Sequence, residues 1–285
     1  MKQMVCKICG SSSLTVFAHT AQCCECGVLL YYPYPEDDKS LVSSGEGKSW
    51  PREEVLEWYS QSSFYGHVNL TNMVRFAMDE SYKGRRIDIL DYGGGGGQFA
   101  LVCKSLFPES TTYITDISDE SLLEEWATVN TQIPFAEFAE NNKRFDLIFL
   151  NDVFEHVSDP LFVLGQLSGK LKSGGKLFID TPKQFWIYPT TRLMSKSLYA
   201  KVLRGTVSTA HLQIWSRKSF ELVVKKSNLK ISKYDETSEY TMSAGFYMKN
   251  MGIRNPVLKL VGHLFYNNAK WLAKNKIVCV LSRED

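Results

Sequence analysis

Two pairs of cysteines near the start of the chain have the spacing of metal-binding knuckles. Each pair reads Cys-x-x-Cys-Gly, and the glycine permits the tight turn behind the two thiolates. Two such pairs complete a tetrahedral set of sulfur ligands with no position left open for chemistry, so we predict one structural zinc ion. Cys24 is left out because Cys23 keeps the spacing and the symmetry of the two pairs. The predicted ligands are Cys6, Cys9, Cys23 and Cys26.

A second stretch that could take part in chemistry is the run of five glycines at residues 93–97. An apolar, β-branched run ending at Asp91 precedes it, and an apolar, helix-like segment from Phe99 follows. This order predicts a strand, a tight turn and a helix, the first unit of a doubly wound α/β sheet. Glycine at such a turn lets a ligand approach the backbone N–H groups of the helix N-terminus. A dinucleotide fingerprint ending at Ala100 also fits, which keeps a nicotinamide-dependent oxidoreductase open.

A carboxylate follows these glycines at a distance that suits a nucleoside. The short run from Tyr113 to Thr115 reads as a strand, and Asp116 ends it about twenty positions after the glycines. A two-oxygen acceptor there can bind a ribose diol, whichever adenosine cofactor is used. The alternative is a helix N-cap for residues 119–127, a role that Ser118 can also fill.

Further along the chain, a buried strand at residues 147–150 ends in polar residues. The surrounding segment reads Phe-Asp-x-Ile, then Asp-Val-x-Glu-His-Val-x-Asp-Pro, and a Gly-Gly turn with another strand follows at residues 174–179. Together with the match of Ile89–Gly97 to the pattern hydrophobic-hydrophobic-acidic-x-Gly-x-Gly-x-Gly, these motifs resemble the class I S-adenosylmethionine-dependent methyltransferases. The resemblance covers roughly residues 85–232. It implies a Rossmann-like, seven-stranded α/β methyltransferase sheet.

The resemblance also implies where S-adenosylmethionine binds. A helical segment expected at residues 51–83 would fold over the cofactor and bring a tyrosine, Tyr59 or Tyr65, near the sulfonium. Ordinary packing of these aromatic rings on the sheet is the alternative. The implied cofactor residues are Tyr59, Asp91, Gly93, Gly95, Gly97, Asp116, Ile117 and Asn151.

The cysteine-rich leader resembles the zinc ribbon that precedes some methyltransferases of sugar and secondary metabolism, because a Tyr-x-Pro-x-Pro-like segment follows it at residues 31–35. We therefore expect a zinc ribbon at 1–35, a linker and helical cap at 36–84, and the methyltransferase domain at 85–285. Cysteine used as a metal ligand indicates a reducing, cytoplasmic setting.

The expected reaction is methylation of a small-molecule acceptor, with transfer to oxygen favoured. An oxygen nucleophile must lose its proton, and His156 and His211 are the candidate bases, although a lone histidine is more often structural. His211 begins a His-x-x-x-aromatic-Ser segment that resembles one found in the family. Residues 181–220 contain basic side chains and no acidic one, which suits a phosphorylated or nucleotide-linked sugar as well as a solvated helix face. Carbon methylation of a keto-sugar, or a non-catalytic protein that binds a partner, are the alternatives.

The composition limits the kinds of partner that the protein can have. The 33 basic and 31 acidic residues nearly cancel, so no global field favours nucleic acid. No apolar run is long enough to cross a membrane. Residues 255–276 are amphipathic and predict a helix packed on the sheet, with contact to a membrane surface or a lipid as the alternative.

Overall fold

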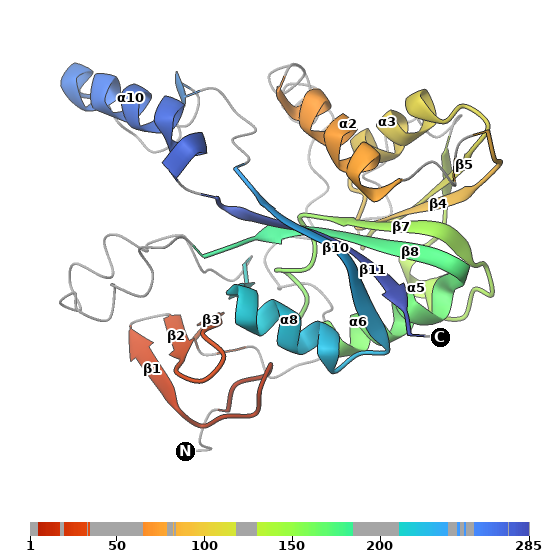
Figure 1. Ribbon diagram of the computed structural model, residues 1–285, viewed down its shortest axis with the longest axis horizontal. Helices are drawn as coiled ribbons and strands as arrows, with labels where there is room; N and C mark the ends of the chain where they lie inside the picture. The colour runs from red at the N-terminus through yellow and green to blue at the C-terminus, as the bar shows by residue number, and fades with distance from the viewer. Residues whose placement is uncertain are drawn as a thin grey trace.

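The computed structural model describes residues 5–17, 20–32, 34, 65–78, 82, 84–117, 130–184, 211–238, 244–245, 248, 254–272 and 274–284. Within these ranges the strands form a seven-stranded and a four-stranded sheet (Figure 1). The larger sheet has the order β10-β11-β8-β7-β4-β5-β6, in which β11 runs antiparallel to its neighbours and the strands from β8 to β6 are parallel. Its strands are β4 (Asp88–Tyr92), β5 (Thr111–Thr115), β6 (Asn130–Gln132), β7 (Phe145–Asn151), β8 (Leu171–Pro182), β10 (Leu229–Thr237) and β11 (Lys276–Arg283).

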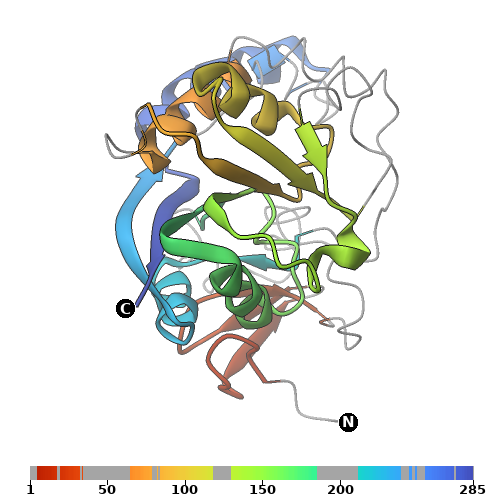
Figure 2. The ribbon, with the colours of Figure 1, turned by 90° about the vertical axis from the view of Figure 1, so that its right-hand side faces the viewer.

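The central strands are buried on both faces of this sheet. Alternate residues along a strand point to opposite faces, so Ile89 and Leu147 join one apolar cluster while Leu90 and Ile148 join the other. Helices α2 and α3 cover the first face, and α5, α6 and α8 cover the second (Figures 1 and 2). The predicted doubly wound α/β architecture is confirmed. These helices are α2 (Tyr65–Ala77), α3 (Gln98–Leu106), α5 (Phe135–Phe138), α6 (Pro160–Lys170) and α8 (Arg217–Lys225).

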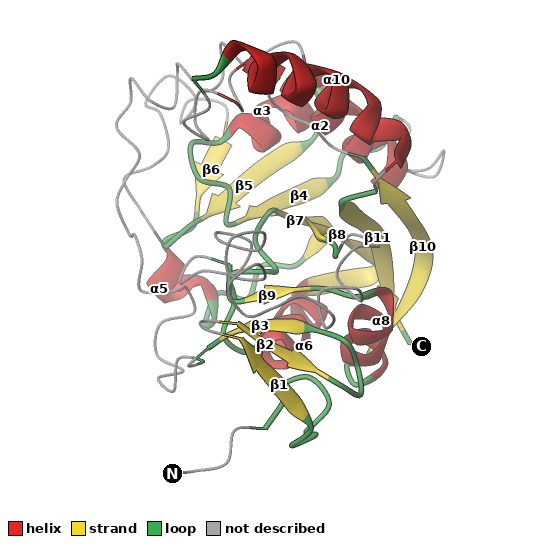
Figure 3. Ribbon diagram, turned by 90° about the vertical axis from the view of Figure 1, so that its left-hand side faces the viewer, coloured by secondary structure: helices red, strands yellow, loops and turns green. Residues whose placement is uncertain are grey.

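The smaller sheet joins the N-terminal strands to a segment almost two hundred residues further along the chain. It has the order β1-β2-β3-β9, with β1 (Leu14–Phe17), β2 (Thr20–Cys23), β3 (Leu29–Tyr31) and β9 (Gln213–Ile214). Its first three strands belong to the predicted ribbon, and β9 comes from the segment that precedes α8 (Figure 3). The sequence analysis expected a ribbon complete within residues 1–35, and this fourth strand was not predicted.

Local sequence fixes the start of the helices that face the ribbon. Ser216 caps α8, since its hydroxyl accepts the N–H of Ser219 at 3.0 Å and the Ser219 hydroxyl accepts the N–H of Ser216 at 3.0 Å. Asp159 caps α6 in the same manner, accepting the N–H of Phe162 at 2.9 Å, and Pro160 occupies the first helical position.

Two predicted helices differ in detail from the structure. The helix expected over 51–83 is α2, which begins at Tyr65, and residues 51–64 lie outside the described ranges. The amphipathic segment at 255–276 forms α10 (Pro256–Leu272), but four of the apolar side chains expected to pack are 55–66% exposed: Val257, Leu260, Val261 and Leu264. Leu258 is exposed as well. The expectation of a packed apolar face was therefore wrong for these residues. Their spacing at 257, 258, 260, 261 and 264 fixes which side chains share a face, but it does not fix what lies opposite that face.

None of the described helices is long and apolar enough to span a membrane.

Candidate functional site

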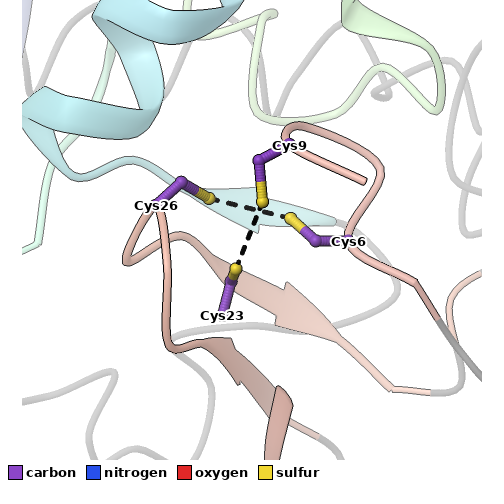
Figure 4. A group of neighbouring side chains, drawn as sticks. All are labelled: Cys6, Cys9, Cys23 and Cys26. Atoms are coloured by element: carbon purple, nitrogen blue, oxygen red, sulfur yellow. Dashed lines mark hydrogen bonds between the residues drawn. The ribbon is translucent and has the colours of Figure 1, made fainter. Parts of the chain in front are cut away.

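The four predicted zinc ligands come together in the structure. Cys6 and Cys9 lie on the first knuckle, Cys23 at the end of β2 and Cys26 on the second knuckle (Figure 4). Their sulfur atoms all lie within 4.8 Å of one another, with 3.7 Å between Cys6 and Cys26 and 3.5 Å between Cys9 and Cys23. Cys24 is exposed, and its sulfur lies 3.4 Å from the hydroxyl of Thr15, away from this group.

These distances fit a tetrahedral zinc ion. Zinc–sulfur bonds of about 2.3 Å at tetrahedral angles separate the sulfurs by about 3.8 Å, close to the two shortest separations in the site. These separations exceed the roughly 2.05 Å of a disulfide bond, and four cysteines at such distances are compatible with a small metal site. Cys6, Cys23 and Cys26 are also fully buried, which suits a structural ion closed off from solvent.

The glycine turn between β4 and α3 presents open space above its backbone. Gly93, Gly95 and Gly97 have φ values of 72°, 48° and 87°. A Cβ atom at Gly95 would meet no atom within 4 Å, whereas one at Gly94 would lie 2.8 Å from the carboxyl group of Asp91. The turn is therefore closed on the side of Asp91 and open at Gly95, where a ligand can approach the main chain.

Asp91 and Asp116 lie on either side of this turn. Asp91 is 2% exposed, and its Oδ2 atom has no hydrogen-bond partner among the described residues. The Oδ2 atom of Asp116 accepts the N–H of Gly95 at 2.9 Å. Ile117 follows with 38% of its surface exposed. A buried acceptor without a partner beside an open glycine turn fits a ligand that carries hydrogen-bond donors.

Burial, together with the negative charge of Asp116, raises the pKa of Asp91 to about 7. Because this value lies above the ordinary value of 3.8, the carboxyl's contribution to stability is fully present below the ordinary pKa and is lost as the pH rises through about 7. Asp91→Asn should therefore become more stable than the wild type as the pH rises from 4 to 8 in ligand-free protein. Since one pKa unit corresponds to about 1.4 kcal/mol, the gain should reach a few kcal/mol at pH 8. Thermal denaturation across this range tests it, and a difference in melting temperature that does not vary with pH would contradict it.

The second half of the site follows β7. Asn151 ends this strand, and its Oδ1 atom is buried with no hydrogen-bond partner among the described residues. Asp152 then has a φ of +53°, the one positive value among the described residues other than glycine. A non-glycine residue with this conformation is strained, and such strain gathers at functional sites. The chain leaves the sheet here and carries Glu155 and His156 back toward its edge.

Glu155, His156 and His211 form one cluster. The rings of His156 and His211 lie 4.9 Å apart between centroids, and Nε2 of His156 lies 3.7 Å from Oε1 of Glu155. That oxygen is buried and accepts no hydrogen bond from a described residue, while Oε2 accepts the hydroxyl of Thr181 at 2.9 Å. Each of the three side chains offers one atom, all within 4.8 Å of one another, so the cluster can exchange protons or ligate a cation.

A buried lysine, which the sequence analysis missed, closes this cluster. Lys276, at the start of β11, is 7% exposed, and its ammonium group forms ion pairs with Asp152 and, at 3.1 Å, with Asp180. Burial and the charge of Asp152 raise the pKa of Glu155 to about 8, while Lys276 acts in the opposite direction. The signal in the sequence was a lone lysine opening an otherwise apolar strand.

The two halves of the site touch. A Cβ atom at Gly93 would lie 2.6 Å from a methyl group of Val153, so the glycine turn packs directly against the loop that carries Glu155 and His156. Both lie at the carboxyl ends of parallel strands, the edge at which open α/β sheets bind their ligands. Tyr59, predicted to lie near the cofactor, is outside the described residues. Arg192 and Arg204, two of the basic residues of 181–220, are also outside them.

This sheet, with its glycine turn and polar carboxyl edge, has the architecture of a class I methyltransferase. Residues 63–234 match the family model of a methyltransferase domain, and the chain belongs to that family. The ubiquinone biosynthesis O-methyltransferase of Coxiella burnetii is 26% identical over 163 residues, which cover 53% of this chain and 68% of that protein. The match confirms the predicted class and sets aside the oxidoreductase that Ala100 left open.

Solved structures agree on the fold. The plantazolicin methyltransferase, solved with S-adenosylhomocysteine, superposes with a TM-score of 0.52 at 16% identity, covering 84% of this chain and 95% of its own. Phosphoethanolamine N-methyltransferase 2 of Haemonchus contortus, solved with S-adenosylmethionine, gives 0.51 at 15% identity and covers 76% and 52%. The chain is therefore an S-adenosylmethionine-dependent methyltransferase.

Proposed function

We propose that this enzyme methylates a hydroxyl group of a sugar, with the glycine turn binding S-adenosylmethionine and the histidine cluster serving the acceptor. The observation that carries the proposal is the contact between the two halves of the site, where Gly93 packs against Val153. The name of the Coxiella relative, an O-methyltransferase, supports transfer to oxygen.

The cofactor residues divide by chemistry. Asp91, Asn151 and Asp116 offer acceptor oxygens for the amino and hydroxyl groups of S-adenosylmethionine, and Gly95 leaves room for it. Once bound, this cofactor supplies a methyl group on a sulfonium that carries its own leaving group. The protein's main tasks are then to align the acceptor and to remove its proton.

The cluster of Glu155, His156 and His211 is suited to accept the proton of the acceptor hydroxyl. His211 or His156 accepts it from the acceptor hydroxyl, and the second ring, 4.9 Å away, stands close enough to share it. Glu155 is 3.7 Å from His156 and, with its raised pKa, is largely protonated at neutral pH. An imidazolium formed at His156 would lower the pKa of this carboxyl again, because an opposite charge nearby favours the ionised form.

The proposed acceptor is a nucleotide-linked or phosphorylated sugar. Fewer basic side chains are available to bind its phosphate than the sequence suggested. The basic residues described within 181–220 are engaged elsewhere: Lys183 pairs with Glu236, Arg217 pairs with Glu221, and Lys218 donates to the carbonyl of Glu25. We propose Arg192 or Arg204 for the phosphate-binding role, because a guanidinium group can donate two parallel hydrogen bonds to a phosphate.

Turnover of UDP-glucose, glucose 1-phosphate and free glucose tests this proposal. We expect the two charged acceptors to be methylated faster, with the advantage lost at high salt and in Arg192→Ala. Equal rates with free glucose, independent of salt, would contradict the charged acceptor. A product methylated on carbon would indicate the keto-sugar reaction, and binding of S-adenosylmethionine without turnover of any acceptor would favour the non-catalytic alternative.

The proposal includes one structural zinc ion in the ribbon. Elemental analysis should find about one zinc per chain, and Cys6→Ser should lose it because three thiolates bind zinc more weakly than four. Cys24→Ser is the matched control, since Cys24 is exposed and outside the sulfur cluster. Full zinc content after both Cys6 and Cys9 are replaced would refute the site.

A further inference from the structure

The ribbon is built into the fold beside the histidine cluster. Its strand β3 pairs with β9, placing Leu29 opposite Ile214 and Leu30 opposite Gln213 (Figure 3). The N–H of Tyr31 extends this pairing to the carbonyl of Leu212 at 2.9 Å. Strand β9 begins two residues after His211, so the ribbon holds the backbone on which that histidine stands.

The side chain of Gln213 links the ribbon to the loop that carries Glu155. It is fully buried, and its Nε2 atom donates to the carbonyl of Phe154 at 2.8 Å and to that of Val157 at 2.9 Å. Its Oε1 atom lies 2.8 Å from the hydroxyl of Tyr34, at the end of the ribbon. One amide therefore bridges both sides of the Glu155–His156 pair and a ribbon tyrosine.

Further hydrogen bonds fix the same two segments. The N–H of Leu212 donates to the carbonyl of Glu155 at 2.9 Å, which ties β9 to this loop. The hydroxyl of Tyr34 also lies 3.0 Å from the carbonyl of Ser158, at the far end of the loop. Both histidines thus stand on backbone held by the ribbon or by groups that the ribbon contacts.

The second cysteine knuckle is also hydrogen-bonded to the segment around β9. Ser216 donates its hydroxyl to the carbonyl of Cys26 at 2.7 Å, and Gln184 donates Nε2 to the carbonyl of Gly27 at 2.7 Å and to that of Ile214 at 2.9 Å. The second knuckle, which contains Cys26, is therefore fastened to the C-terminal end of β9, through Gln184 at Ile214 and through Ser216 two residues further on.

We propose that the zinc ribbon positions the acceptor-side histidines, so that zinc in the ribbon controls methyl transfer without controlling S-adenosylmethionine binding. The inference rests on the proposed roles of His156 and His211, and on zinc in the four-cysteine site. Small ribbons lose their fold without the metal. Release of zinc would free β3, leave the buried amide of Gln213 without its tyrosine partner, and loosen both histidine segments together. The glycine turn follows β4 and is hydrogen-bonded to the end of β5, and it shares none of these hydrogen bonds; it meets the loop only where Gly93 packs against Val153 among the contacts described here.

The first test removes zinc from the intact protein with a mercurial and a chelator. Hydrogen exchange should rise in residues 152–158 and 211–216 and stay unchanged in 88–100. The dissociation constant for S-adenosylmethionine should change less than about twofold. The rate with UDP-glucose as acceptor should fall about a hundredfold, the usual result of misplacing a catalytic group by about 1 Å. Unchanged exchange in both histidine segments, or loss of cofactor binding alongside the rate, would overturn the inference.

The second test leaves the metal in place. Tyr34→Phe removes the hydroxyl next to Gln213 and should lower kcat about tenfold, as expected for one buried hydrogen bond, with KM for the cofactor unchanged. Lys226→Met is the matched control. It removes a different ribbon contact, from the ammonium group of Lys226 to the carbonyl of Ile8 at 2.6 Å, which lies away from both histidine segments.

Equal effects of Tyr34→Phe and Lys226→Met on kcat and on exchange in 211–216 would overturn the positioning role. The outcomes also separate the inference from the proposed function. If UDP-glucose is not turned over at all, the proposed acceptor fails, while exchange and cofactor affinity still decide whether the ribbon positions these segments.

Discussion

Gly95→Val is expected to abolish S-adenosylmethionine binding while the protein stays folded. A Cβ atom at this position meets no protein atom within 4 Å, so the new side chain would fill the space proposed for the ligand. We expect affinity to fall at least about a hundredfold, equivalent to about 2.7 kcal/mol, as measured by titration calorimetry. Circular dichroism should show an unchanged fold.

Gly174→Val separates lost space from backbone strain. Gly174 shares the two local features of Gly95, with a φ of +72° and no atom within 4 Å of a Cβ, but it lies near the start of β8, at the opposite edge of the sheet. Both variants should lose about 1–2 kcal/mol of stability from the left-handed conformation. Only Gly95→Val should lose the cofactor, and unchanged affinity in that variant would remove the glycine turn from the site.

Loss of both imidazoles is expected to have the largest effect on the reaction itself. The double variant His156→Ala, His211→Ala should lower kcat by about 10²–10⁴-fold, the usual contribution of a general base. S-Adenosylmethionine affinity should stay within about twofold, because the two rings lie beside Glu155, whereas the proposed cofactor contacts come from the glycine turn, Asp91 and Asp116. The rise of kcat with pH, which reports removal of the proton from the base, should disappear in the double variant.

The single variants show how the two rings divide the work. If one ring accepts the proton and the other assists it, their effects on kcat should be far from additive. His263→Ala, on the exposed face of α10, is the matched control and should leave kcat unchanged. Zinc content should stay near one ion per chain in all these variants. If the double variant loses a second ion along with its activity, Glu155, His156 and His211 form a metal centre and the general-base proposal is wrong.

Features fixed by local spacing could be predicted from the sequence. The four clustered cysteines lie in two short motifs of the same Cys-x-x-Cys-Gly pattern, and each motif almost determines its own turn. The glycine run likewise predicted the junction of β4 and α3, because an apolar strand, a turn and a helix follow one another without interruption. The uninterrupted apolar run at residues 147–150 predicted a strand buried on both faces of the sheet.

Features made by distant residues could not be predicted in this way. Strand β9 is only Gln213–Ile214, too short for any periodicity, and it is a strand because β3 lies beside it. The sequence placed Lys276 at the end of an amphipathic segment. In the structure it forms ion pairs with Asp152 and Asp180, which are distant in the sequence and are brought to it by the sheet. The assignments of the individual cofactor and catalytic residues remain predictions.

The pairing of β3 with β9 also sets an order of events during synthesis. Tyr34 and Gln213, which meet in the finished protein, are 179 residues apart in the chain. Both knuckles leave the ribosome early and can take up zinc at once, whereas β3 keeps an unpaired edge until nearly the whole methyltransferase sheet has been made. Exposed edges of this kind invite pairing with other chains, and contacts between distant residues form slowly. The nascent ribbon therefore exposes a strand edge that zinc binding alone does not cover, and that edge is protected only when β9 pairs with it.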